Sequence, residues 1–349
     1  MQTIKKYLSG MAVCLAIAVP SWLLGKLVPV IGGPVFSIVI GMVIALFWTP
    51  GAACKPGVGF TSKKILQTAV VLLGFGLNLS VVLETGKQSL PIIVCTIATS
   101  LLVAFALHKL LHIDGNISTL IGVGSSICGG SAIAATAPVI HADDEEVAQA
   151  ISVIFFFNVL AALLFPLLGQ AIGFDTTSGE SFGIFAGTAV NDTSSVTAAA
   201  STWDSMWELG SQTLDKAVTV KLTRTLAIIP AVLVFAAINL HLKKKESAQA
   251  NGVKVSIRSI FPWFILAFLA MSLLTSLGLL PAGLVSGLKT ISKFLMVAAL
   301  AAIGLNTNFK SLCRSGAKPM LHGFIISTLV VLVAIGVEYM IGIAPYGTL

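Results

Sequence analysis

Residues 122–135, GVGSSICGGSAIAA, lie in the middle of an apolar segment. The stretch is rich in small and polar residues and contains two adjacent glycines. A plain lipid-facing helix does not have this composition. Paired glycines weaken a helix and let its backbone open. Inside a bilayer, an opened helix exposes amide groups that lipid cannot satisfy, so these groups must line a cavity or bind something. The stretch therefore predicts an interrupted helix, and the alternative is close helix packing through small residues.

Such an interruption creates a second half-helix whose N-terminus lies within the membrane. Its free N–H groups and the positive end of its dipole favour an anion. We therefore expect substrate contacts from the residues at the break, which are Ser125, Ser126, Cys128, Gly129, Gly130 and Ser131.

A second polar interruption lies in residues 187–200, which read GTAVNDTSSVTAAA. Asp192 is the most informative residue there, because an intramembrane carboxylate costs several kcal/mol unless it is paired, hydrated or protonated. Burial would let it take up and release a proton during a transport cycle. We expect a coupling ion to bind at Asn191, Asp192, Thr193 and Ser194. The alternatives are that Asp192 caps a half-helix or lies in a short surface loop.

Two cations lie inside the segment that follows Leu214. Lys221 and Arg224 are three residues apart, so they share one helix face. A buried cation needs a partner, and either Asp192 or a bound anion would serve. We include both cations among the expected substrate-binding residues. The alternative is that their side chains extend to the lipid headgroups.

The composition places the whole chain in a membrane. The 349 residues are 56% hydrophobic and only 10% charged, whereas soluble domains carry about 25% charged residues. A spanning helix needs about 20 apolar residues. Almost all of the chain divides into such segments, at about 7–29, 33–49, 64–83, 89–111, 117–140, 147–172, 181–200, 215–241, 259–280, 290–306 and 319–343.

We therefore predict an all-α fold, a polytopic membrane helix bundle of about 10–11 transmembrane helices, two of them interrupted. Residues 1–349 form one membrane domain, with a first part at 1–241, a cytoplasmic linker at 242–257 and a second part at 258–349.

The net charge of +7 is explained by topology. The basic residues lie in short loops, and loops rich in Lys and Arg stay on the cytoplasmic side. If eleven segments cross, the N-terminus lies inside and the C-terminus outside. The acidic run 143–146 and a loop with Trp203, Asp204, Trp207 and Glu208 then lie outside. Basic residues are not interleaved with aromatic ones, which argues against nucleic acid as a partner.

The chain also resembles itself. Residues 62–86, SKKILQTAVVLLGFGLNLSVVLETG, and 292–316, SKFLMVAALAAIGLNTNFKSLCRSG, share an opening Ser-Lys, a Gly-Leu-Asn and a final glycine. The two copies run in opposite directions in the predicted topology, and inverted repeats are the common plan of secondary transporters. Chance similarity between apolar helices is the alternative. The same topology makes the two interrupted segments parallel, whereas inverted repeats require antiparallel ones.

Several of these stretches resemble the YeiH-type family of bacterial inner-membrane proteins, which are described as sulfate exporters. The resemblance runs from about residue 30 to the end, through GSSICG at 124–129, the break at 187–200, the Lys221/Arg224 helix, AAIGLNT at 301–307 and GAKP at 316–319. It implies a multi-pass secondary transporter distantly similar to sodium/proton antiporters and bile-acid symporters, with their crossed broken helices. Where relatives often carry His-Glu in the second break, this chain has Asn191-Asp192, so a proton-carrying histidine is not expected there.

The sequence thus predicts a secondary transporter in the bacterial inner membrane. It would move a small inorganic or organic anion, sulfate or a related one, with H⁺ or Na⁺, and a homo-oligomer is left open. There is no Gly-Lys-Ser or Gly-Lys-Thr phosphate loop for ATP hydrolysis, and no cofactor, metal site or catalytic residue is expected. The alternatives are a passive anion channel and a membrane-embedded enzyme or sensor, for which Cys128 with Asp192 is the only candidate pair.

Overall fold

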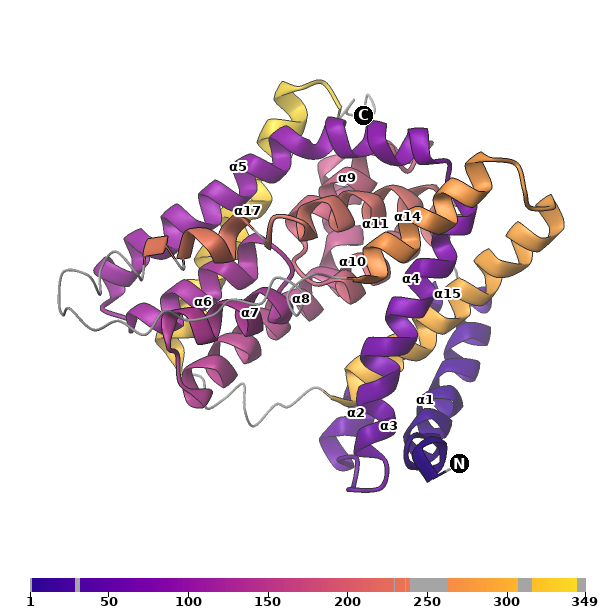
Figure 1. Ribbon diagram of the computed structural model, residues 1–349, viewed down its shortest axis with the longest axis horizontal. Coiled ribbons are helices and arrows are strands. Elements are labelled where there is room, and N and C mark those ends of the chain that lie inside the picture. The colour runs from indigo at the N-terminus through magenta and orange to yellow at the C-terminus, as the bar shows by residue number, and fades with distance from the viewer. Residues whose placement is uncertain are drawn as a thin grey trace.

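The structure, a computed structural model, describes residues 2–28, 32–228, 230–235, 237–238, 263–306 and 316–343. Within these ranges every regular element is a helix (Figure 1). Seven helical runs in them are long and apolar enough to cross a membrane. The predicted all-helical membrane bundle is confirmed.

A first bundle combines the start of the chain with two late helices. Its elements are α1 (Gln2–Leu27), α2 (Gly32–Phe47), the continuous run α3 (Lys55–Phe60), η1 (Thr61–Ile65), α4 (Leu66–Leu73) and η2 (Gly74–Gly76), and then α14 (Trp263–Ser276) and α15 (Ala282–Leu305). Helix α2 packs along α15. The backbones come very close there, because a Cβ atom on Gly304 would overlap the Ile38 carbonyl oxygen. Small residues permit such close helix packing in membranes.

A second bundle holds the two predicted interruptions. Its elements are α5 (Leu79–Leu111), α6 (Gly115–Ser126), α7 (Gly130–Ile140), α8 (Asp144–Ile172), α9 (Glu180–Ala189), α10 (Thr193–Met206), α11 (Gln212–Thr225) and α17 (Ala317–Met340). The helical run of α11 continues to Phe235. The linker predicted at 242–257 lies outside the described residues. The bundles are not divided at that linker, since α14 and α15 pack with α1–α4 and α17 packs with α5.

Helices α6 and α7 form a hairpin. Three residues separate α7 from α8, and the N-cap of α8, Asp143, forms a capping box with Glu146. Glu146 also accepts hydrogen bonds from the side-chain amide of Asn116 at the start of α6, at 3.1 and 3.2 Å. Helix α7 therefore returns to the end of the molecule from which α6 entered.

Helices α9 and α10 form a second hairpin at the opposite end. Asp204, near the end of α10, accepts hydrogen bonds from the backbone N–H groups of Thr213 and Leu214 at the start of α11, both at 2.9 Å. Phe182, near the start of α9, stacks on Trp203 of α10 with ring centroids 4.1 Å apart. Because α8 crosses the bundle between the two hairpins, they enter from opposite ends.

This arrangement corrects the predicted topology. Segments 117–140 and 181–200 contain the predicted interruptions, but each segment turns back instead of crossing the membrane. As a consequence the acidic run 143–146 lies at the end where α5 finishes and α17 begins, not opposite it. The positive-inside rule places that end in the cytoplasm, because Lys109 and Lys318 lie there. Trp207 and Glu208 lie at the other end, as predicted, but Trp203 and Asp204 of the same predicted loop belong to the last turn of α10.

The two copies of the proposed repeat lie side by side and antiparallel. Ser292, near the middle of α15, donates a hydrogen bond to the Ala69 carbonyl at 2.6 Å, and Lys289 lies against Gly76. The helices that follow, α5 and α17, also pack against each other. Their antiparallel direction follows from the clusters that join Ile92 to Ala334 and Leu107 to Ile326. An inverted repeat requires this arrangement, although residues 307–315 of the second copy lie outside the described residues.

Candidate functional site

The tips of the two hairpins meet at the middle of α8. Asn158, the central residue of that helix, accepts hydrogen bonds at Oδ1 from the backbone N–H groups of Asn191 (3.1 Å) and Asp192 (3.3 Å). A Cβ atom on Gly129 would lie 3.5 Å from Asn158 Nδ2 and 3.8 Å from Asp192 Cβ. Asn158 of this crossing helix is therefore bonded to the second tip and lies beside the first.

Lys221 of α11 bonds to both tips. Its side chain is fully buried. The ammonium group donates to the carbonyl of Ile127 in the first tip at 2.5 Å and to that of Val190 in the second at 3.1 Å. Asp192 is close enough to attract this cation electrostatically.

Arg224, one turn further along α11, repeats the pattern. Its guanidinium group, also fully buried, donates from Nε to the Ser126 carbonyl at 2.7 Å and from Nη2 to the Ser125 carbonyl at 2.9 Å. A third hydrogen bond runs from Nη1 to the carbonyl of Thr188 in the second hairpin. The fork of donors on an arginine suits this contact with several acceptors.

The partners of these cations are therefore the carboxyl ends of α6 and α9. The last carbonyls of a helix have no acceptor role within it and carry the negative end of its dipole. Two such ends inside a bilayer would be costly without donors. Lys221 and Arg224 supply donors and positive charge to both, so neither side chain extends to the headgroups.

The amino ends of α7 and α10 differ in their capping. Asp192 is the N-cap of α10, and its carboxylate accepts a hydrogen bond from the Ser194 N–H at 3.0 Å and another from the Ser194 hydroxyl. Asp192 thus caps a half-helix, one of the alternatives above, but it does so at the hairpin tip and not in a surface loop. The N-cap of α7 is Gly129, with φ of 67°, and α7 has no side-chain cap.

Open space lies beside the uncapped amino end of α7. A Cβ atom on Gly130 would meet no atom within 4 Å, and the Ser131 side chain is exposed. The Ser131 hydroxyl therefore lies at an exposed position beside this helix end. This is the half-helix terminus that the sequence predicts for an anion.

The other predicted residues lie behind this surface or beside it. Ser125, Ser126, Cys128, Asn191 and Ser194 are buried, and Thr193 is half-buried. Ser126 donates to the Val123 carbonyl at 2.9 Å. The buried atoms Ser125 Oγ and Asn191 Oδ1 have no hydrogen-bond partner among the described residues. The structure thus gathers every predicted site residue around the tips, but only part of the set faces open space.

Glu338 was missed by the sequence reasoning. This residue of α17 is fully buried, and neither carboxyl oxygen has a hydrogen-bond partner within the described ranges. The signal was available, since it is a lone carboxylate inside the last predicted segment, and such residues are functional by default. Across those same ranges, no group of three or more His, Cys, Asp or Glu side chains is placed to hold a metal ion.

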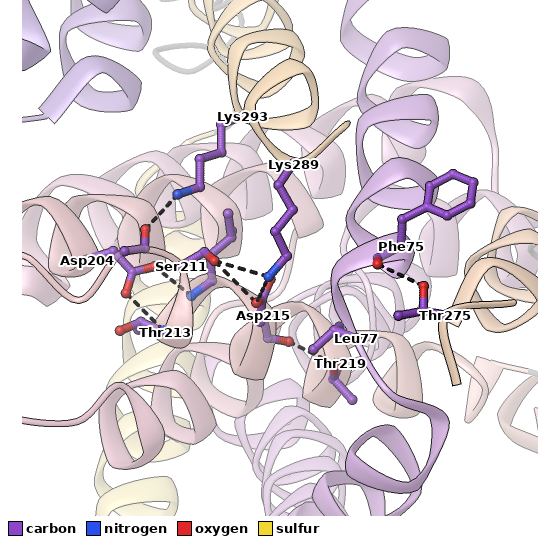
Figure 2. A network of polar contacts seen from close by, with 12 residues as sticks. Phe75, Leu77, Asp204, Ser211, Thr213, Asp215, Thr219, Thr275, Lys289 and Lys293 are labelled. Carbon is purple, nitrogen blue, oxygen red and sulfur yellow. Dashed lines mark hydrogen bonds and ion pairs between the residues drawn. The ribbon is translucent and has the colours of Figure 1, made fainter. Parts of the chain in front are cut away.

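Polar contacts also join the two bundles at the end opposite the cytoplasmic one (Figure 2). Lys289 of α15 forms an ion pair with Asp215 of α11 at 2.9 Å. Lys293, one turn further, donates to the Gly210 carbonyl at 2.6 Å. Helices α2 and α15 contact α10, and α14 contacts α5. In the described part of the chain, the α6/α7 hairpin is not among the elements in close contact with the first bundle.

Comparison with known proteins finds similar proteins that are also named membrane proteins. Residues 9–323 match the family model described as "Conserved hypothetical protein 698". A UPF0324 membrane protein of Streptococcus pyogenes serotype M6 is 55% identical over 346 residues, covering 98% of this chain and 100% of the relative. A UPF0324 membrane protein of Fusobacterium nucleatum is 52% identical over 350 residues, covering 96% and 99%. The chain is therefore a multi-pass protein of the bacterial plasma membrane and belongs to the UPF0324 membrane protein family.

Proposed function

We propose that this protein is a secondary active transporter of a small anion, sulfate or a related one, coupled to H⁺ or Na⁺. The observation that carries the proposal is the meeting of two hairpin tips that enter from opposite ends of the bundle. Irregular backbone at this depth is tolerated where it is buried in protein or lines a cavity. Transporters place their substrate sites at such interrupted helices near the midplane.

The charges at the tips favour an anion as substrate. Lys221 and Arg224 bring two positive charges, and Asp192 brings one negative charge, so the formal balance of these three side chains is positive. The uncapped amino end of α7 adds partial positive charge beside the exposed Ser131. An anion bound there would offset this excess, and it would accept hydrogen bonds from the first N–H groups of α7.

The coupling ion belongs at Asp192. Its carboxylate caps α10 while its backbone N–H bonds to Asn158. A proton or Na⁺ arriving at this carboxylate would weaken its hold on the amino end of α10, and that end would then be free to attract the anion as well. Binding of the two species at adjacent tips is the physical basis of the proposed coupling.

Transport by purified protein in liposomes tests the proposal. Uptake of radiolabelled sulfate is expected to rise above equilibrium when a pH or Na⁺ gradient is imposed. Asp192→Asn is expected to abolish gradient-driven uptake. Asp175→Asn is the matched control, because Asp175 accepts hydrogen bonds from Thr177 in the loop before α9, far from the tips. Flux that never exceeds equilibrium would instead indicate a channel.

The enzyme or sensor alternative has its own test. Cys128 is buried in the first tip, and the proposal gives its thiol no chemical role. Cys128→Ser is expected to leave sulfate uptake unchanged. Loss of all activity in a folded Cys128→Ser protein would favour chemistry at the thiol over transport.

A further inference from the structure

A cavity of about 190 Å³ lies between the two bundles, near the end opposite the cytoplasmic one. At about 30 Å³ per water molecule it has room for roughly six waters, or for a small polyatomic ion. Helix α10 supplies Ser201, Asp204 and Ser205, whereas α1 and α15 supply Lys26 and Lys293. Polar groups from both bundles therefore converge on one space.

Most of the acceptors in this cavity are already used. Both carboxylate oxygens of Asp204 accept backbone N–H groups, from Thr213 and Leu214. The Ser201 carbonyl accepts a hydrogen bond from the Ser205 hydroxyl at 2.8 Å. A ligand entering the cavity would therefore find few free acceptors.

Donors remain available. Lys26 lies over the ring of Trp22, at 5.7 Å from its centroid, and has no carboxylate partner among the described residues. The Ser201 hydroxyl likewise has no hydrogen-bond partner within the described part of the chain. Lys293 lies near Asp204 and donates to Gly210, but an ammonium group has three protons to give. Two lysines against one carboxylate leave a positive excess.

We infer that this cavity is a second anion site, which takes a small oxyanion between Lys26, Lys293 and Ser201. This inference rests on the proposed function in one respect, since the cavity would bind the anion before the anion moves on to the tips. Ser201 lies nine residues after Asp192 on the hairpin, roughly 13 Å along α10 at about 1.5 Å per residue. The cavity is thus distinct from the tip site but lies along the same helix.

The occupant would touch both bundles. Lys26 and Lys293 belong to the first bundle and Ser201 to the second. An anion bridging them would favour the arrangement in which the bundles are closed at this end, because it binds that arrangement better than one in which they part. The site would therefore link anion concentration outside the cell to the conformation of the protein.

Thiol labelling tests the cavity without requiring transport. Ser205→Cys is expected to react roughly tenfold faster with an anionic methanethiosulfonate reagent than with a cationic one, because the surrounding charge attracts the anion. Sulfate is expected to slow this reaction at constant ionic strength held with chloride. Peptide mass spectrometry reads the labelled position, so native cysteines do not interfere. Leu279→Cys is the matched control, since it is exposed in the loop before α15 and outside the cavity.

Substitution of Lys26 tests whether its charge causes the preference for the anionic reagent. Lys26→Gln in the Ser205→Cys protein is expected to remove most of the preference for the anionic reagent and to weaken sulfate protection roughly tenfold. Lys87→Gln, an exposed lysine of α5 at the same end, is expected to change neither. Equal rates for the two reagents at Ser205→Cys, or no protection by sulfate, would overturn the inference.

The same labelling in an Asp192→Asn background separates this inference from the proposed function. Protection by sulfate is expected to persist there, because Asp192 does not line the cavity. If wild-type protein fails to transport sulfate while protection remains, the proposed function fails and the cavity site stands. If protection is lost in Asp192→Asn, the anion binds at the tips and the cavity site is wrong.

Discussion

Arg224 shows how one buried side chain can stabilise the interrupted backbone of two hairpins. Its guanidinium group reaches carbonyls of both hairpins, from Ser125, Ser126 and Thr188. From the sequence we expected Asp192 or a bound anion as its partner. A buried cation does need a partner, but the carbonyls freed by a helix break are also acceptors, and sequence spacing gives no indication of which helix ends will face it.

Arg224→Lys is expected to destabilise the protein by about 2–4 kcal/mol, since an ammonium group keeps the charge but cannot reach three carbonyls in the same geometry, and hydrogen bonds to charged groups contribute about 1.5–3 kcal/mol each. Thermal unfolding in detergent measures the effect. Lys318→Arg, at an exposed position of α17, is the control and is expected to be neutral. An unchanged melting temperature for Arg224→Lys would mean that the guanidinium fork is not required.

Glu338 gives a prediction with the opposite sign. Because its carboxyl group is fully buried without a partner among the described residues, Glu338→Gln removes the cost of keeping an ionisable group from water. The variant is expected to be as stable as wild type or about 1 kcal/mol more stable. Thermal unfolding at several pH values checks this. A clear loss of stability would show that the carboxylate has a partner which the amide cannot replace.

At the scale of elements, the sequence predicted where the helices are interrupted. It did not predict whether the chain after each interruption crosses the membrane or turns back. The glycine pair at 129–130 and the polar run at 191–195 both mark breaks. Whether the chain then continues or turns back depends on contacts with other elements. For the second hairpin these are the bonds from Thr213 and Leu214 to Asp204. Such contacts leave no trace in the periodicity of the hairpin itself, so both segments were expected to cross.

The first tip offers a matched pair of glycine substitutions. Gly129 has a positive φ of 67° and lies against Asn158, so Gly129→Ala is expected to cost about 1–2 kcal/mol. Gly130 is helical with open space beside its Cα, so Gly130→Ala is expected to be neutral or stabilising by up to about 1 kcal/mol. Chemical or thermal denaturation of the purified proteins compares them. Equal effects of the two substitutions would argue against a tight turn at 129.

At the scale of the whole molecule, the polar contacts described between the two bundles gather at one end, whereas apolar side chains of α2, α8, α10 and α15 pack together further along. The Lys289–Asp215 pair and the Lys293–Gly210 contact lie opposite the cytoplasmic end. The exposed Ser131 belongs to the other hairpin, which does not closely contact the first bundle in the described residues. In the proposed transport cycle, this structure corresponds to the state in which the bundles are joined at the outer end.

Removing the ion pair between the bundles is expected to favour opening at the outer end. In Asp215→Asn, a cysteine introduced at Ser131 should become several-fold more reactive to an impermeant thiol reagent added from outside, because an attraction specific to the closed state is lost. Glu180→Gln is the matched control, since its partner Lys216 lies in the same bundle at the same distance of 2.9 Å. Identical labelling in the two variants would show that the Lys289–Asp215 pair does not hold the bundles together.

The long separation along the chain between the first hairpin tip and Arg224 has a consequence for biosynthesis. The carbonyls of Ser125 and Ser126 obtain their donors from a residue 99 and 98 positions later. While the ribosome is still making the intervening chain, the α6/α7 hairpin has unsatisfied backbone groups and cannot settle into the hydrocarbon layer. We expect the α6/α7 hairpin to stay in the headgroup region until α11 has left the ribosome. Nascent chains stopped before residue 212 should then be preferred substrates of membrane quality-control proteases.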